Sequence, residues 1–241
     1  MFDSKKVKNE LVQWIRNWFD ENGQDCNAVI GISGGKDSTV AAALCVEALG
    51  KDRVIGVLMP NGVQSDIEDS QRVCSLLGIK NYTINIGETA AALREEIGNA
   101  GVFTTEQARI NLPPRLRMAT LFAVAQSLNG RVCCNSNLSE RYIGYFTFGG
   151  DNIGSFAPLA NLTVTEVINI GDALGLPYDL VHKTPSDGLC GKSDEENIGI
   201  SYDALDRYLM YCEGDQETRR KIEALHEKNK FKLREIESFV L

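Results

Sequence analysis

The 241-residue sequence contains only two histidines, His182 and His226, and their separation is unlike that of paired metal ligands. It has no apolar run long enough to cross a membrane as a helix. Basic residues are outnumbered, with 25 Lys and Arg against 33 Asp and Glu, and the net charge is -8 at pH 7. These absences exclude a histidine-rich metal centre and a membrane span. They also argue against non-specific nucleic-acid binding, which needs a basic face.

The seven cysteines are odd in number, and no two have the spacing of a zinc knuckle or a redox motif. Most of them lie within apolar runs, so we expect small buried side chains in a reducing compartment. The amphipathic N-terminus carries acids and lacks the apolar core of a secretory signal. We therefore expect a cytoplasmic protein. Its length fits one large domain over residues 1–241.

Short apolar runs alternate with amphipathic segments along most of the chain. The runs predict strands at 26–33, 52–60, 80–86 and 130–136. The amphipathic segments predict helices at 5–22, 38–49, 66–78, 88–99, 116–128, 163–177, 201–214 and 216–230. This alternation indicates an α/β fold, a doubly wound parallel sheet with helices on both faces, whose ligands bind at the carboxyl ends of the strands. The segment 142–162 has no clear period, which is typical of a functional or a disordered loop.

The stretch SGGKDS joins the first predicted strand to a helix. Gly34 and Gly35 allow backbone conformations closed to other residues, so successive N–H groups can converge on an anion. The helix N-terminus adds its unpaired N–H groups, and the hydroxyls of Ser33 and Ser38 can donate to phosphate. Asp37 would repel phosphate, which indicates a cation between them, and Mg²⁺ is the natural choice. The alternative is a plain strand–turn–helix connection in which Asp37 and Ser38 only start the helix.

The spacing of this stretch is neither that of a Walker A loop nor that of the dinucleotide fingerprint. It resembles the pyrophosphate loop of the N-type ATP pyrophosphatases, which cleave ATP to AMP and pyrophosphate and activate a carboxyl or carbonyl oxygen as an adenylate. Further stretches resemble ammonia-dependent NAD synthetase in order and rough spacing: MPNGVQSDIEDS, RLRMATLFAVAQ, NSNLSERYIGYFTFGGD, LANLTVTEV, KTPSDGL and SDEENIGISYDALDRYL. The resemblance implies the Rossmann-like fold of the adenine nucleotide alpha hydrolases.

The same resemblance implies a ligase that forms a C–N bond. ATP, with Mg²⁺, would adenylate the carboxylate of deamido-NAD, and ammonia would then give NAD, AMP and pyrophosphate. We expect no glutamine-hydrolysing domain before the loop, so free ammonia or ammonia from a partner is the implied nitrogen source. The family is usually homodimeric, which makes a homodimer the expected assembly. We expect small-molecule substrates and neither a nucleic-acid nor a membrane partner.

Site residues are implied position by position. Asp37 and Glu140 would hold Mg²⁺. The candidate catalytic residues are Asp37, Glu140 and Asp151, the last as a base for ammonium. Arg115, Phe148 and Asp151 would contact the substrate. The ATP site would comprise Gly31, Ile32, Ser33, Gly34, Gly35, Lys36, Asp37, Ser38, Asn135 and Ser186.

Several positions depart from the family pattern. Phe148 stands where the family has a substrate-contacting lysine, and Val164 where a lysine is expected to reach ATP. An acid expected near Ser155 is missing, and Phe231-Lys232 replaces His-Lys. Each lost charge-assisted hydrogen bond costs roughly 1.5–3 kcal/mol. These departures leave two alternatives open: a related ATP pyrophosphatase that adenylates another carboxylate or carbonyl, and a nucleotide-binding homologue without turnover.

Overall fold

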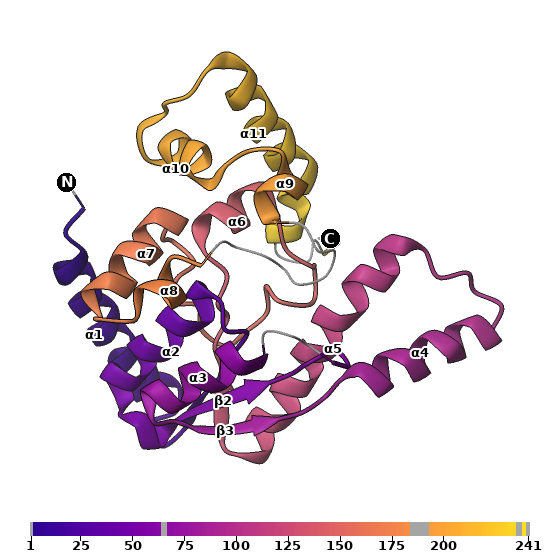
Figure 1. Ribbon diagram of the computed structural model, residues 1–241, viewed down its shortest axis with the longest axis horizontal. Coiled ribbons are helices and arrows are strands. Elements are labelled where there is room, and N and C mark those ends of the chain that lie inside the picture. The colour runs from indigo at the N-terminus through magenta and orange to yellow at the C-terminus, as the bar shows by residue number, and fades with distance from the viewer. Residues whose placement is uncertain (1, 64–66, 184–192, 235–237, 240–241) are drawn as a thin grey trace.

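A parallel sheet lies at the centre of the computed structural model, which describes residues 2–63, 67–183, 193–234 and 238–239 (Figure 1). Its strands, in the order β3-β2-β1-β4, are β1 (Asn27–Gly31), β2 (Val54–Leu58), β3 (Lys80–Thr83) and β4 (Gly130–Val132). All three neighbouring pairs are parallel. The chain proceeds outward from β1 to β3 and then returns to the other side of β1. The topological switch point, where ligands of such sheets bind, therefore lies between β1 and β4.

Helices cover both faces of this sheet, as the alternating pattern predicted. Ala28 and Ile30 of β1 enter one core and Val29 enters the other, because successive strand side chains point to opposite faces. The first core is closed by α1 (Ser4–Asn22), α2 (Lys36–Leu49), α3 (Ile67–Leu77) and α7 (Val164–Ala173). The second is closed mainly by α5 (Glu106–Ser127). The fold is thus a doubly wound, Rossmann-like α/β fold.

The prediction that a helix begins at Leu116 is wrong. The α5 helix begins at Glu106, where the Thr105 side chain caps it, and it continues through Pro113 and Pro114. Prolines inside a helix remove backbone hydrogen bonds and normally end or kink it. Here both rings are buried, and Pro114 packs so closely on Gly150 that an added Cβ there would lie 3.1 Å from it. Tertiary packing therefore outweighs the tendency of the two prolines to end the helix.

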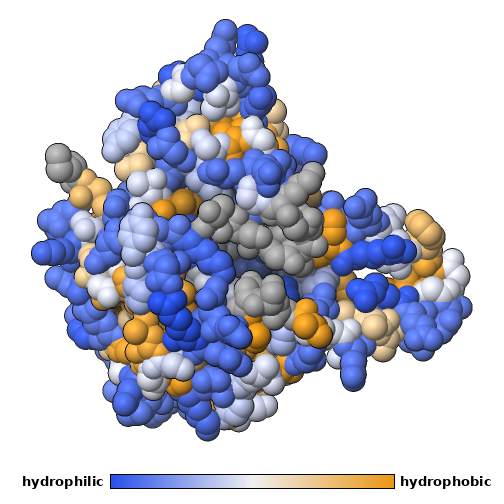
Figure 2. Space-filling view, viewed as in Figure 1, coloured by the Kyte–Doolittle hydropathy of each residue, from blue (hydrophilic) through white to orange (hydrophobic). Residues whose placement is uncertain are grey.

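A two-helix arm projects from the sheet layer, formed by α4 (Gly87–Asn99) and the first half of α5 (Figure 1). Large apolar side chains are exposed on it, with Leu93 at 39%, Val102 at 58% and Phe103 at 84%. Apolar surface is visible over this arm at the right of Figure 2.

The C-terminal helices form a third core above the sheet. The helices involved are α6 (Leu138–Ile143), α10 (Tyr202–Tyr211) and α11 (Gln216–Asn229), with the short α9 (Asp194–Ile198) before α10. The short α8 (Tyr178–Val181) packs into the first core through Leu180. Short 3-10 helices span Lys51–Arg53 and Lys230–Leu233. No helix in the described part of the chain is both long and apolar enough to cross a membrane.

The irregular segment 142–162 lies along the sheet. Phe156 forms a parallel bridge with Cys133 just beyond β4 and stacks on Trp18 with ring centroids 5.0 Å apart. Cysteines behave largely as expected, since five of the six in the described ranges are buried and Cys212 is exposed. Of the two tryptophans, Trp18 packs against the core and Trp14 remains 42% exposed.

Candidate active site

The glycine-rich loop follows β1 and leads directly into α2, at the carboxyl edge of the sheet. Gly34 adopts a φ of +78°, a left-handed conformation that favours glycine. Hydroxyls hold the turn together: the Gly35 N–H donates to Ser33 Oγ at 3.2 Å, and Ser38 Oγ donates to the Gly35 carbonyl at 3.1 Å. Thr39 Oγ1 donates to the same carbonyl at 2.8 Å. The loop is thus fixed in shape at a helix N-terminus, the usual setting for phosphate binding.

The remaining loop residues predicted for ATP lie on the same edge. Ile32 is buried, and its N–H donates to the Val57 carbonyl at 3.0 Å, which continues the sheet past Gly31. The Asn135 side chain reaches across from the β4 side, and its Nδ2 donates to the Gly31 carbonyl at 3.0 Å. Asn135 Oδ1 is buried without a hydrogen-bond partner. A ligand bound beside the loop could donate a hydrogen bond to this oxygen and so satisfy it.

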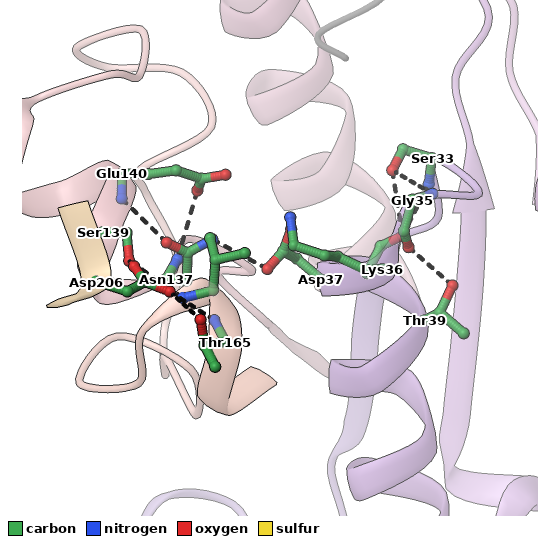
Figure 3. A network of polar contacts seen from close by, with 12 residues as sticks. Ser33, Gly35, Lys36, Asp37, Thr39, Asn137, Ser139, Glu140, Thr165 and Asp206 are labelled. Carbon is green, nitrogen blue, oxygen red and sulfur yellow. Dashed lines mark hydrogen bonds and ion pairs between the residues drawn. The ribbon is translucent and has the colours of Figure 1, made fainter. Parts of the chain in front are cut away.

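Asn137 connects the two predicted metal ligands, although the sequence analysis gave it no role. Its side chain is fully buried, and Nδ2 donates to Asp37 Oδ1 at 3.0 Å (Figure 3). Its Oδ1 accepts the Glu140 N–H at 3.0 Å, and its own N–H donates to Glu140 Oε2 at 3.5 Å, which completes a capping box at the start of α6. The Asn-x-x-Glu pattern is a helix-start signal and could have been read from the sequence.

The pKa of Glu140 is shifted by burial and by neighbouring charges. Glu140 is only partly buried by surface area. Even so, the protein around its carboxyl removes enough water to raise its pKa to about 8, and the negative charge of Asp37 adds to the increase. The ammonium of Lys36 acts in the opposite direction. A hard cation with oxygen ligands would stabilise the charged form of a carboxylate in this position.

The predicted substrate residues also lie together. Arg115, on the surface of α5, donates from Nε to the Phe148 carbonyl at 3.2 Å. Asp151 Oδ1 accepts the Thr147 N–H at 2.8 Å, so Asp151 closes the same turn. The Phe148 ring is 47% exposed and lies 6.3 Å from the ring of Phe231, centroid to centroid.

A lysine of the C-terminal segment contacts the chain just before this turn. Lys232 Nζ donates to the Gly144 carbonyl at 2.7 Å and to the Phe146 carbonyl at 3.2 Å. The two phenylalanines that replace polar family residues, Phe148 and Phe231, are therefore neighbours, and Lys232 ties their segments together.

The remaining positions named from the family pattern lie away from these two groups of residues or outside the described part of the chain. Val164 is buried in the third core and its N–H donates to Ser139 Oγ, so this position faces the interior. Ser155 lies beside β4, where its Oγ accepts the Val132 N–H at 3.2 Å. Ser186, predicted for ATP, lies outside the described residues.

A buried carboxylate, which was not among the predicted site residues, accepts hydrogen bonds from α6 and α7. Asp206 is 2% exposed and accepts hydrogen bonds from Ser139 Oγ and from both the N–H and the hydroxyl of Thr165, each of the latter at 2.7 Å (Figure 3). It thereby connects α10 to the first turns of α6 and α7. No periodicity or motif in the sequence distinguishes this aspartate from a surface one.

A shaped glycine loop at the switch point of a parallel sheet, flanked by a bridged pair of carboxylates, defines a nucleotide-binding α/β protein that handles phosphates. Comparison with known proteins narrows this class. The family model described as NAD synthase matches residues 7–240. The chain belongs to the NAD synthase family.

Individual relatives agree with that assignment. The chain is 40% identical over 208 residues to the NH(3)-dependent NAD(+) synthetase of Thermococcus sibiricus, covering 86% of this chain and 80% of the relative. It is 36% identical to that of Archaeoglobus fulgidus, over 95% and 94% of the two chains. Among solved structures, an NMN synthetase from Francisella tularensis matches with a TM-score of 0.92 and 31% identity over 100% of both chains.

Proposed function

We propose that this protein is a C–N bond-forming ligase that amidates deamido-NAD with ammonia, using ATP and releasing AMP and pyrophosphate. Membership of the NAD synthase family supports the reaction. The single structural observation that supports the proposal is the Asp37–Asn137–Glu140 connection beside the glycine loop, because an Mg²⁺–ATP site would need two such neighbouring carboxylates.

The donor set fits Mg²⁺. Asp37 and Glu140 would supply carboxylate oxygens, and burial together with the charge of Asp37 raises the pKa of Glu140 to about 8. In the described residues, no group of three His, Cys, Asp or Glu side chains is arranged as a complete metal cage. Mg²⁺ typically uses one or two protein carboxylates together with substrate phosphates, and the Asp37–Glu140 pair suits that arrangement. When bound, Mg²⁺ would neutralise charge that develops on the phosphates.

The chain's own residues then supply positioning. The loop N–H groups between Ser33 and Ser38 would hold the departing pyrophosphate without reorganising, because their turn is already fixed by hydroxyl contacts. The acceptor carboxylate would attack the α-phosphorus in line, and ammonia would attack the resulting acyl-adenylate and expel AMP. Asp151 is the proposed base that takes a proton from ammonium. No nucleophilic side chain is needed, so most of the catalysis would come from orientation.

A second acceptor is favoured by a specific observation. The match to the NMN synthetase extends over the whole of both chains, and by the same amidation the acceptor that yields NMN is nicotinate mononucleotide. Phe148 also replaces a family lysine that contacts the substrate, and Phe231 replaces a family histidine; the two rings form an exposed aromatic pair next to Arg115. A shorter acceptor would not need every charged contact that a dinucleotide uses.

The test compares the two acceptors directly. Purified protein with ATP, Mg²⁺ and ammonium would be given deamido-NAD or nicotinate mononucleotide, and kcat/KM would be measured from NAD, NMN and AMP. We expect deamido-NAD to have the higher value. A preference of more than about ten-fold for the mononucleotide would replace the proposal with the second candidate. Absence of product with both would contradict the function itself.

A matched variant examines the aromatic position. Phe148→Lys restores the cation of the family pattern on an exposed turn. We expect it to lower the KM for deamido-NAD by about ten-fold, because a charge-assisted hydrogen bond is gained, while kcat changes little. Phe148→Leu, which removes the ring without adding charge, serves as the control. Equal effects of the two variants would show that charge at this position does not select the acceptor.

We also infer a homodimer, with residues 1–241 as one domain, in the cytoplasm. The exposed apolar residues of the α4–α5 arm support self-association, since isolated protruding helices gain stability by burying such surface. The buried free thiols suit a reducing compartment. Light scattering would test the assembly, and a monomer at micromolar concentration would contradict it.

A further inference from the structure

Lys36 is buried although it follows directly on the phosphate loop. It is the first residue of α2, and only 3% of its surface is exposed. Its Nζ lies 2.9 Å from Asp37 Oδ2 and 5.6 Å from the centre of the Tyr202 ring. Lysines are almost never buried this fully unless a partner balances their charge. The side chain is therefore committed to an interior contact and not to solvent.

Acidic groups from three elements surround this ammonium. Asp37 of α2 pairs with it directly, and Glu140 of α6 and Asp194 of α9 act on it through their charges. Asp194 is itself 6% exposed and accepts a hydrogen bond from the Tyr145 hydroxyl at 3.4 Å. The 2.9 Å ion pair with Asp37 supplies the partner that balances the charge of this buried ammonium. The lysine thus remains charged.

The hydroxyl of Tyr202 marks the same cluster. The ring is 4% exposed, and its hydroxyl oxygen is buried without a hydrogen-bond partner. The charges of Glu140 and Asp194 act on this hydroxyl and raise its pKa, after burial itself. A buried phenol that faces an ammonium and several carboxylates indicates a polar cluster assembled around charge and not around apolar packing.

We propose that Lys36 is the resident counter-cation of the active site. Its ammonium holds Asp37, Glu140 and Asp194 together before Mg²⁺ and nucleotide arrive, and it repels Mg²⁺ until phosphates add negative charge. Metal entry is thereby coupled to nucleotide entry, with Lys36 acting as a positioning residue through Asp37. The inference rests on the proposed function only in assigning Mg²⁺ and ATP to this loop.

Direct phosphate binding is the other role that a lysine in such a loop could serve. The structure favours the counter-cation role, because the Nζ contacts are with Asp37 and the Tyr202 ring and the side chain is buried. In that role the effect of the lysine is present without any nucleotide. Experiments on the nucleotide-free protein therefore separate the two.

The experiment uses Lys36→Met, which keeps the length and apolar stem of the side chain. Melting temperature and calorimetric Mg²⁺ binding would be measured without nucleotide, in EDTA and in millimolar Mg²⁺. For wild type we expect the same melting temperature in both solutions. For the variant we expect a lower melting temperature in EDTA, recovery in Mg²⁺, and a Mg²⁺ affinity at least about ten-fold higher, since a positive charge has left the site. If Mg²⁺ does not raise the melting temperature of the variant and the variant binds Mg²⁺ no more tightly than wild type, the proposal is overturned.

Two further variants keep the proposal falsifiable if Lys36→Met folds poorly. Lys36→Met with Asp194→Asn removes one charge of each sign, and we expect it to recover stability in EDTA without metal. If the double variant is no more stable than the single one, Lys36 acts through packing and the proposal fails. Lys8→Met is the matched control, because Lys8 forms a 2.6 Å pair with Glu47 far from the loop. Its melting temperature should not respond to Mg²⁺. None of these readouts uses turnover, so an error in the proposed acceptor would leave them intact.

Discussion

Replacing Gly34 with alanine should displace the phosphate loop. Gly34 has a φ of +78°, where an L side chain costs about 1–2 kcal/mol. An added Cβ would also lie 2.8 Å from Asp69 Cβ and 2.9 Å from the backbone nitrogen of Ser70, which is part of α3 and cannot move aside freely. Overpacking of this kind costs about 1–3 kcal/mol. We therefore expect Gly34→Ala to lose about 2–5 kcal/mol of unfolding free energy.

The neighbouring glycine supplies the matched control. Gly35 has an extended conformation, with φ of -86°, and an added Cβ would meet only Ser33 Oγ, at 3.3 Å. Gly35→Ala should change stability by less than about 0.5 kcal/mol. Urea unfolding would measure both, and the melting temperature of Gly34→Ala should fall by roughly 5–15 °C. Equal stability of the two variants, or a larger loss for Gly35→Ala, would refute the loop geometry.

Three further outcomes follow from buried contacts and from the arm. Asn137→Ala should lower the unfolding free energy by about 2–4 kcal/mol in urea, because it removes the α6 cap and leaves Asp37 without its amide donor. The same variant should raise the Mg²⁺ concentration needed for half-maximal AMP release. An unchanged Mg²⁺ requirement would argue against a role for Asn137 in connecting Asp37 to Glu140. Asp206→Ala should cost about 3–5 kcal/mol, because Thr165 and Ser139 keep buried donors without an acceptor; a loss below about 1 kcal/mol would show that water replaces the carboxylate. Phe103→Ser should raise the dimer dissociation constant by at least about ten-fold in sedimentation experiments without altering the melting of the monomer, and unchanged association would place the interface elsewhere.

The parts of the fold that could be predicted are those in which local pattern and tertiary structure agree. The strand β1 and the glycine turn after it are determined by residues close to each other in the sequence. Both lie where the sequence predicted. The alternation of strands with helices along the chain likewise predicted a parallel sheet with both faces covered. The strand β1 indeed supplies side chains to two cores. The family resemblance agrees with the matched family and with the curated relatives.

What failed depended on distant partners. The α5 helix runs through Pro113 and Pro114, both of which are buried, and Gly150 packs on Pro114; no local rule contains that contact. The bridging role of Asn137 could be read only in part, since its capping pattern is local but its bond to Asp37 spans 100 residues. Asp206 gave no signal at all. Its partners lie on α6 and α7, so its burial follows from helix packing alone.

The roles of individual site residues remain predictions. The structure brings Asp37, Asn137 and Glu140 together and, separately, Arg115, Phe148 and Asp151. The first group would act on ATP and the second on its acceptor.

The most direct test of the central claim follows an oxygen atom. Deamido-NAD labelled with ¹⁸O in its carboxylate would be turned over with ATP, Mg²⁺ and ammonium, and the AMP and NAD would be analysed by mass spectrometry. If the carboxylate is adenylated, AMP forms in step with NAD and carries one ¹⁸O from the acceptor. AMP that is unlabelled, or that forms equally well without the acceptor, would show that ATP is cleaved by water and would contradict the account.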